Sequence, residues 1–117
     1  MRYAIVAMVL LGPSVVCNAI AADWKTVEGT YAITARNYLD PSESEPKDGH
    51  LRLQLSGETA RDLYLAMKVA ETVDECTGAR AKQIGDMRCL FDESEKRHAC
   101  HFAIDLAHQK IEYGVAC

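Results

Sequence analysis

An uncharged segment near the start of the chain limits how much of the sequence can belong to a folded domain. Arg2 provides a short positive start, and no charged side chain follows from Tyr3 to Val16. A membrane-spanning helix needs about 20 apolar residues to cross about 30 Å of hydrocarbon, whereas this segment is shorter and a Gly-Pro pair interrupts it. Ala19-Ile20-Ala21 supplies the small residues that a signal peptidase reads. We therefore expect residues 1–21 to be a cleavable signal peptide and residues 22–117 to form a single small disulfide-stapled domain.

Export would leave four cysteines for the folded domain, because Cys17 is lost with the signal. The four are Cys76, Cys89, Cys100 and Cys117. An even number of cysteines in an oxidising compartment predicts two disulfides. A zinc site would need closely spaced pairs such as C-x2-C, whereas the gaps here are 12, 10 and 16 residues. Lipid attachment at Cys17 is disfavoured, because a bulky valine precedes it where a lipoprotein signal has a small residue. The expected location is the periplasm or the cell exterior.

The size and charge of the remaining chain narrow the functions further. Removing 21 of the 117 residues leaves 96, enough for one domain with one modest core and too few for two. The formal net charge of the whole chain is −4, and it becomes −5 once Arg2 is removed with the signal. An acidic surface argues against binding of nucleic acid, which needs clustered Lys and Arg. It favours solubility or a basic partner.

Hydrophobic alternation predicts two strands and then a helix in the first half of the domain. Residues 30–39 alternate apolar and polar side chains, and from His50 to Leu55 the leucines at every second position point to one face. Ser56 can cap the helix that follows, and Glu58 places negative charge in its first turn. This helix of about 12 residues carries one apolar stripe that we expect to face the core: Ala60, Leu63, Tyr64 and Met67.

The second half is typical of an antiparallel meander. After an irregular acidic stretch, short turns such as Gly85-Asp86 separate four strand-like segments, residues 81–84, 87–92, 97–106 and 110–117. One face of this meander would collect large apolar side chains, and the other would carry charged residues, including Asp105 and Glu112. The pattern predicts an α+β fold with one helix packed on an antiparallel sheet of about five to six strands, in the order β-β-α-β-β-β-β.

The registers of two hairpins bear on the disulfide pairing. A turn centred on His108-Gln109 places Cys100 opposite Cys117 and gathers the large apolar residues of both strands on one face, which a one-residue slip would scatter. This register favours a Cys100–Cys117 bridge and, by exclusion, Cys76–Cys89. The preceding hairpin instead places Cys89 opposite Cys100, so Cys89–Cys100 with Cys76–Cys117 is the alternative pairing.

No motif in the sequence predicts catalysis. The chain has no G-x-S-x-G elbow, no glycine-rich phosphate loop and no spare cysteine after signal cleavage. His98 and His101 have a metal-like spacing, but in a strand they point to opposite faces, and Cys100 between them is expected in a disulfide. We therefore expect no enzyme activity, no cofactor and no metal.

An acidic loop is the candidate binding element. Residues 40–49 carry four acidic side chains and one lysine, and their prolines indicate a loop. A solvated connector is the simpler interpretation. If the loop binds a partner, Glu43, Glu45 and Asp48 would make the contacts, and charge complementarity would suit a basic enzyme cleft.

In general plan, a small, acidic, disulfide-bonded exported domain resembles the periplasmic inhibitors and immunity proteins that act against cell-wall-degrading enzymes. Ser56-Gly57 matches the start of one lysozyme-inhibitor motif, but the tyrosine that continues the motif is absent, so no residue role is carried over. The resemblance implies an exported, non-enzymatic binding protein whose partner is a basic hydrolase. Two alternatives stay open: a small-ligand or peptide carrier with Trp24, Tyr38 and Tyr64 as aromatic walls, and an envelope assembly partner that adds a strand at an open sheet edge.

Overall fold

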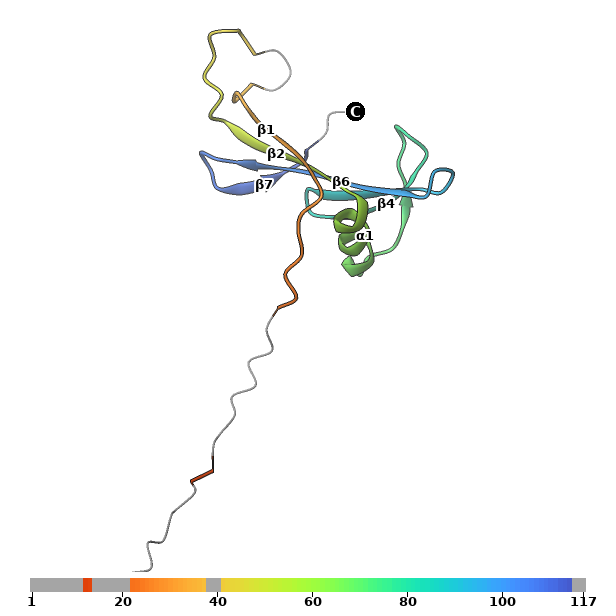
Figure 1. Ribbon diagram of the computed structural model, residues 1–117. Helices are drawn as coiled ribbons and strands as arrows, with labels where there is room; N and C mark the ends of the chain where they lie inside the picture. Colours follow the sequence, from red (N-terminus) through yellow and green to blue (C-terminus); the bar gives the residue numbers. More distant parts are fainter. Residues whose placement is uncertain (1–11, 14–21, 38–40, 115–117) are drawn as a thin grey trace, which may run out of the picture.

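The computed structural model describes residues 12–13, 22–37 and 41–114 (Figure 1). The expected signal peptide, residues 1–21, lies almost wholly outside these ranges, so its cleavage stays a prediction. One helix and seven strands follow in the order β1 (Gly29–Thr34), β2 (His50–Ser56), α1 (Gly57–Ala66), β3 (Thr72–Val73), β4 (Arg80–Ile84), β5 (Met87–Asp92), β6 (Arg97–Asp105) and β7 (Lys110–Glu112). In the described part of the chain no helix is long and apolar enough to cross a membrane.

The strands form one antiparallel sheet in the order β1-β2-β6-β5-β4-β3, and β7 pairs with β6. β6 is central: β2 runs along one side of it, and the other side carries first β5 and then β7. The predicted α+β class and antiparallel sheet are confirmed. The two-residue strand β3 was not expected. It forms because Asp74 accepts a hydrogen bond from the Gly78 N–H and donates its own N–H to the Ala79 carbonyl, which returns the chain beside β4.

Helix α1 starts where it was predicted and is ten residues long. Ser56 occupies the N-cap position, but its hydroxyl makes no capping hydrogen bond, while Glu58 lies in the first turn as expected. The helix ends where Met67 becomes extended. Lys82 Nζ then donates to the carbonyls of Tyr64 and Met67, at 3.0 and 3.2 Å. This lysine brings positive charge to the negative end of a helix that has no basic residue in its own last turn.

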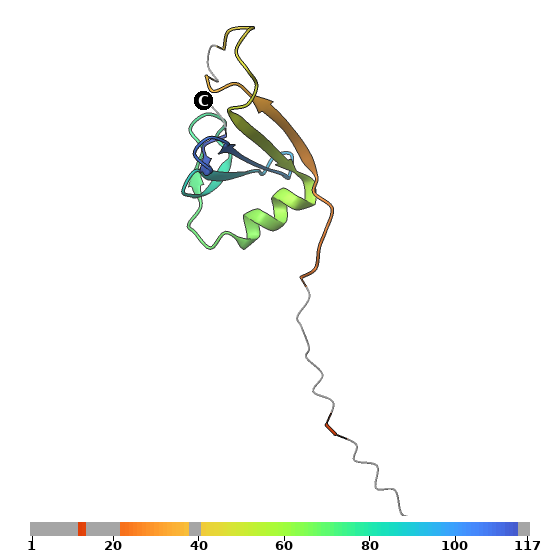
Figure 2. The same ribbon diagram turned by 90° about the vertical axis from the view of Figure 1, so that its left-hand side faces the viewer.

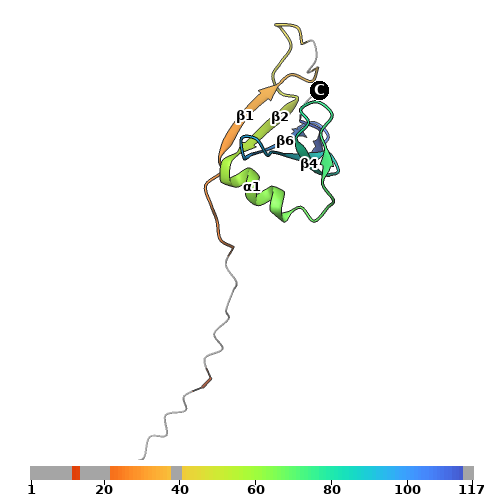
Figure 3. The ribbon, with the colours of Figure 1, turned by 90° about the vertical axis from the view of Figure 1, so that its right-hand side faces the viewer.

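The core lies between α1 and the middle of the sheet. The predicted helix stripe faces it: Ala60, Tyr64 and Met67 are buried, and Leu63 packs beside them. The sheet contributes the disulfide sulfurs together with Leu55 and Phe91. Figures 2 and 3 show α1 on one side of the sheet and the loop between β1 and β2 at the opposite end of the domain.

The preferred disulfide pairing is wrong. Cys89 is bonded to Cys100, so neither Cys76–Cys89 nor Cys100–Cys117 can form. The reason is the pairing of β5 with β6, which places Cys89 directly opposite Cys100, as the alternative pairing requires. The second bridge of that alternative involves Cys117, which lies outside the described residues, and it stays a prediction.

The last hairpin is shifted by two residues from its predicted register. Ile104 faces Ile111, whereas the predicted turn places Leu106 opposite Ile111. A two-residue shift leaves every side chain on its original face, so the gathering of apolar side chains does not distinguish the two registers. The turn is set instead by Asp105, whose carboxylate accepts hydrogen bonds of 3.0 Å from the backbone N–H groups of residues 107 and 108.

Candidate functional site

Part of the helix-facing side of the sheet lies beyond the helix. α1 packs chiefly on β6 and covers a cross-strand row formed by Leu55, Cys100 and Cys89. Two further rows continue the same face away from the helix. We call these seven side chains the open apolar face: Tyr31, Leu53 and Phe102 in one row, and Ile33, Leu51, Ile104 and Ile111 in the next.

The open apolar face is accessible to a partner. Tyr31 is 72% exposed, Ile33 47% and Ile111 50%, and the remaining members are partly buried. Single exposed apolar residues are common on protein surfaces, but a contiguous group marks an interaction site. The face exists because α1, with ten residues, is about 15 Å long and reaches over only one end of the strands.

Among the strands that the structure describes, β1 lies at the edge of the sheet and pairs with β2 alone. The Glu28 carbonyl accepts from the Ser56 N–H at 3.1 Å, and the Thr34 carbonyl accepts from the Gly49 N–H at 2.9 Å. Because backbone groups of an antiparallel strand alternate in direction, those of Tyr31 and Ile33 point away from β2. The segment Gly29–Thr34 contains neither a charged residue nor a proline, which are the usual protections of an exposed edge.

The acidic loop adjoins this edge. A hollow of about 560 Å³ lies between residues 32–35 and the loop, and Glu43 and Glu45 are among the side chains that line it. Glu43 and Asp48 are exposed, whereas Glu45 is partly buried and accepts a hydrogen bond from the Asn37 N–H at 3.1 Å. Glu45 therefore also stabilises the loop, whereas the side chains of Glu43 and Asp48 are more accessible to a partner.

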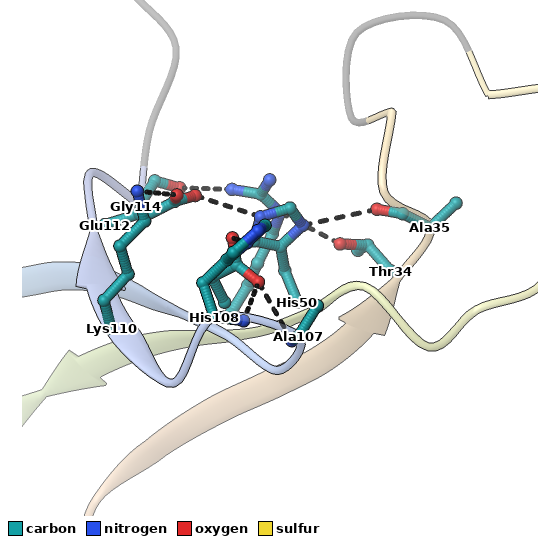
Figure 4. A network of polar contacts seen from close by, with 10 residues as sticks. Thr34, Ala35, His50, Ala107, His108, Lys110, Glu112 and Gly114 are labelled. Atoms are coloured by element: carbon teal, nitrogen blue, oxygen red, sulfur yellow. Dashed lines mark hydrogen bonds and ion pairs between the residues drawn. The ribbon is translucent and has the colours of Figure 1, made fainter.

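The strand registers place a polar cluster on the side of the sheet opposite α1, at the end near β7. Figure 4 shows this cluster from close by. It joins His50 of β2, Asp105 of β6 and Glu112 of β7, and one possible metal-ligand atom from each residue lies within 4.8 Å of the other two. His50 Nε2 is 3.0 Å from Glu112 Oε2, and His50 Nδ1 is 3.4 Å from the Ala35 carbonyl oxygen. Glu112 also forms an ion pair with Lys110 at 3.5 Å.

Asp105 is the buried member of this cluster, with 8% of its surface exposed. His108 Nδ1 lies 2.8 Å from Asp105 Oδ2. This histidine and the two backbone N–H groups of the turn lower the pKa of Asp105 to about 2. Asp105 is thus an ionised carboxylate in a partly enclosed place, with its orientation set by the turn.

Sequence reasoning missed this cluster. Asp105 and Glu112 were expected on one face, but His50 is far from both in the sequence and was read as the start of a strand. The pairing of β2 with β6, which places His50 opposite Asp105, is a tertiary contact.

The two histidines considered from the sequence lie on opposite faces, as predicted. His98 stacks on Phe91 at 4.4 Å and meets the edge of Tyr64 at 5.2 Å, and burial lowers the pKa of His98. His101 pairs across the sheet with Arg88, and burial lowers its pKa as well. His98 therefore belongs to the packing beneath α1.

The aromatic residues suggested for a carrier are not gathered in the described structure. Tyr64 is buried, and its hydroxyl donates to Glu71 Oε1 at 2.8 Å. Trp24 is 91% exposed, and Tyr38 lies outside the described residues. Tyr64 is a core residue.

A hollow of about 670 Å³ lies at the start of α1, beside the turn between β5 and β6. Its lining includes three basic side chains, Arg61, Lys96 and Arg97. Glu58 also lines it, and the Glu58 carboxylate is paired with Lys25 at 3.2 Å. A carboxylate inside the hollow opposes the binding of an anion.

No protein-family model, curated protein or solved structure matches the chain.

Proposed function

We propose that this protein is an exported, non-enzymatic binding protein that holds an extended segment of a basic protein against β1, and that the partner is an enzyme such as a cell-wall-degrading hydrolase. The observation that carries the proposal is an unprotected edge strand whose outward side chains, Tyr31 and Ile33, belong to an exposed apolar face. An added strand would receive backbone hydrogen bonds from the edge and apolar contacts from the face.

The acidic loop supports a basic partner. Glu43 and Asp48 are exposed, and Glu43 lines the hollow beside β1. Acidic side chains beside an apolar edge favour a segment that carries apolar residues followed by Lys or Arg, and they would speed the encounter with a basic protein. The negative formal charge of the whole chain also favours association with a basic protein.

The binding test uses protein exported into an oxidising compartment and a panel of basic wall hydrolases. Affinity is measured by calorimetry, and hydrolysis of wall substrate is followed in the same mixtures. We expect at least one hydrolase to bind and to lose activity. Neutralising the loop (Glu43→Gln, Glu45→Gln and Asp48→Asn together) should slow association and reduce its dependence on salt.

A matched pair of substitutions at Ile33 separates edge pairing from simple apolar contact. Ile33→Pro removes an N–H that points to the open edge and leaves the bonds to β2 in place. Ile33→Thr keeps that N–H and makes the side chain smaller and more polar. We expect Ile33→Pro to abolish binding and Ile33→Thr to weaken it. Equal binding by both variants and the unchanged protein would refute edge pairing, and a β1-dependent homodimer would show that the edge serves a second copy instead.

A further inference from the structure

The polar cluster of His50, Asp105 and Glu112 has the composition and spacing of a divalent metal site. It combines an imidazole nitrogen with two carboxylates from three different strands, and the nearest ligand atoms lie within 4.8 Å of one another. An ion with bonds of about 2.1 Å holds its ligand atoms about 3 to 4 Å apart. Side-chain adjustments of about 1 Å would therefore complete the coordination.

The surroundings of His50 orient the ring as a ligand. Its Nδ1 faces the Ala35 carbonyl at 3.4 Å, and its Nε2 faces the Glu112 carboxylate at 3.0 Å. Each ring nitrogen of His50 therefore faces an acceptor. With a cation at Nε2, the ring would donate from Nδ1 to the carbonyl, as metal-bound histidines usually do.

The carboxylates are held in place and are partly shielded from water. Asp105 is fixed by the turn N–H groups and by His108, and its side chain is 11% exposed. Glu112 is 32% exposed, so the cluster opens to solvent on the β7 side. Two positive side chains lie nearby: Lys110, which is 61% exposed, and Arg52, which donates to Thr34 Oγ1 and to the Gly114 carbonyl. These positive charges limit the affinity of the cluster for a cation.

From this geometry we propose that His50, Asp105 and Glu112 bind one first-row divalent cation of the Zn²⁺ type and thereby clamp β7 to the sheet. The imidazole favours such an ion over Mg²⁺ or Ca²⁺, which prefer oxygen ligands alone. Three protein ligands leave a coordination position for water. β7 is three residues long and pairs with β6 alone in the described sheet, so a bridge from β7 to β2 would restrain it. This inference does not depend on the proposed binding function.

The test is a titration of the purified exported protein with Zn²⁺ alone after dialysis against a chelator. We expect 1:1 binding by calorimetry and a higher Tm, with no Tm response to Mg²⁺ at the same concentration. Glu112→Gln and His50→Gln should each weaken binding about tenfold or more. Glu95→Gln, which changes an exposed acid elsewhere on the surface, should bind within about threefold of the unchanged protein.

Hydrogen exchange on the unchanged protein keeps the test independent of how well the variants fold. Zn²⁺ should slow exchange at residues 110–114 and at the facing end of β2. Absence of binding, or binding that survives Glu112→Gln, would overturn the proposal and leave the cluster as an ion-pair network. Protection confined to another part of the molecule would overturn it too.

Discussion

Removing one partner of the ion pair between Asp74 and Arg88 should destabilise the β3–β5 end of the sheet. Asp74 is 5% exposed, and the Arg88 side chain is 19% exposed. The Asp74 carboxylate accepts hydrogen bonds from the Thr77 N–H at 3.0 Å and the Thr77 hydroxyl at 2.7 Å, and Arg88 donates to its other oxygen. Arg88 Nε is buried without a hydrogen-bond partner, so the guanidinium depends on Asp74 for compensation.

Asp74→Asn keeps the shape of the side chain and removes its charge. Breaking one side of a buried ion pair costs about 3 to 5 kcal/mol, because the other charge stays buried. Arg88 keeps some solvent contact and a hydrogen bond of 2.8 Å to Gln83. We therefore expect a loss near the lower end, about 3 kcal/mol in the free energy of unfolding, measured by urea denaturation.

Two further variants test the stated cause. Asp92→Asn removes a carboxylate that accepts similar hydrogen bonds from Ser94 but has no buried arginine, and its effect should be much smaller. Asp74→Asn combined with Arg88→Met should recover at least half of the loss. A loss below about 1 kcal/mol for Asp74→Asn, or no recovery in the double variant, would refute the reasoning.

The pH dependence provides a second check. Hydrogen bonds from Thr77 are the main cause that holds the pKa of Asp74 below its ordinary value. The hydrogen bond from Arg88 and its positive charge lower this pKa further. A carboxyl with a lowered folded-state pKa contributes stability that is fully present above its unfolded pKa of about 3.9 and is lost as pH falls through the folded value. Asp74→Asn should therefore lose less stability than the unchanged protein on acidification below about pH 4.

Three other changes have definite expected outcomes. Replacing Cys89 and Cys100 together by alanine should cost about 3 kcal/mol by opening a loop of about 12 residues, measured by urea denaturation, and peptide mapping of the unchanged protein should recover this bridge. Lys82→Met should lower the free energy of unfolding by about 1 kcal/mol, because two carbonyls at the end of α1 lose their donor; an unchanged urea midpoint would contradict this. Tyr64→Phe should cost about 1 kcal/mol at neutral pH through the lost bond to Glu71. Burial raises the pKa of Tyr64 to about 12, so the unchanged protein should lose stability as pH rises above about 10, and Tyr64→Phe should lose less in alkaline denaturation.

The individual strands, the helix and one turn could be predicted from the sequence. The leucines of β2 and the stripe of α1 follow the periods of a strand and a helix, and both face the core side as expected. The turn at Gly85-Asp86 also formed as predicted, with Ile84 opposite Met87. These features depend on neighbours within a few residues, which is why one sequence suffices to predict them.

The features that depend on which strands become neighbours could not be predicted from the sequence. The alternation of β6 and β7 is the same in registers two residues apart, so Asp105 and its turn, and not the apolar pattern, set the pairing of Ile104 with Ile111. The disulfide pairing could not be chosen from the sequence for a similar reason, because it depends on the pairing of β5 with β6. His50 reaches Asp105 and Glu112 only because β2 and β7 flank β6. The open apolar face exists because α1 is shorter than the strands it covers, a mismatch that becomes visible once the helix is docked on the sheet.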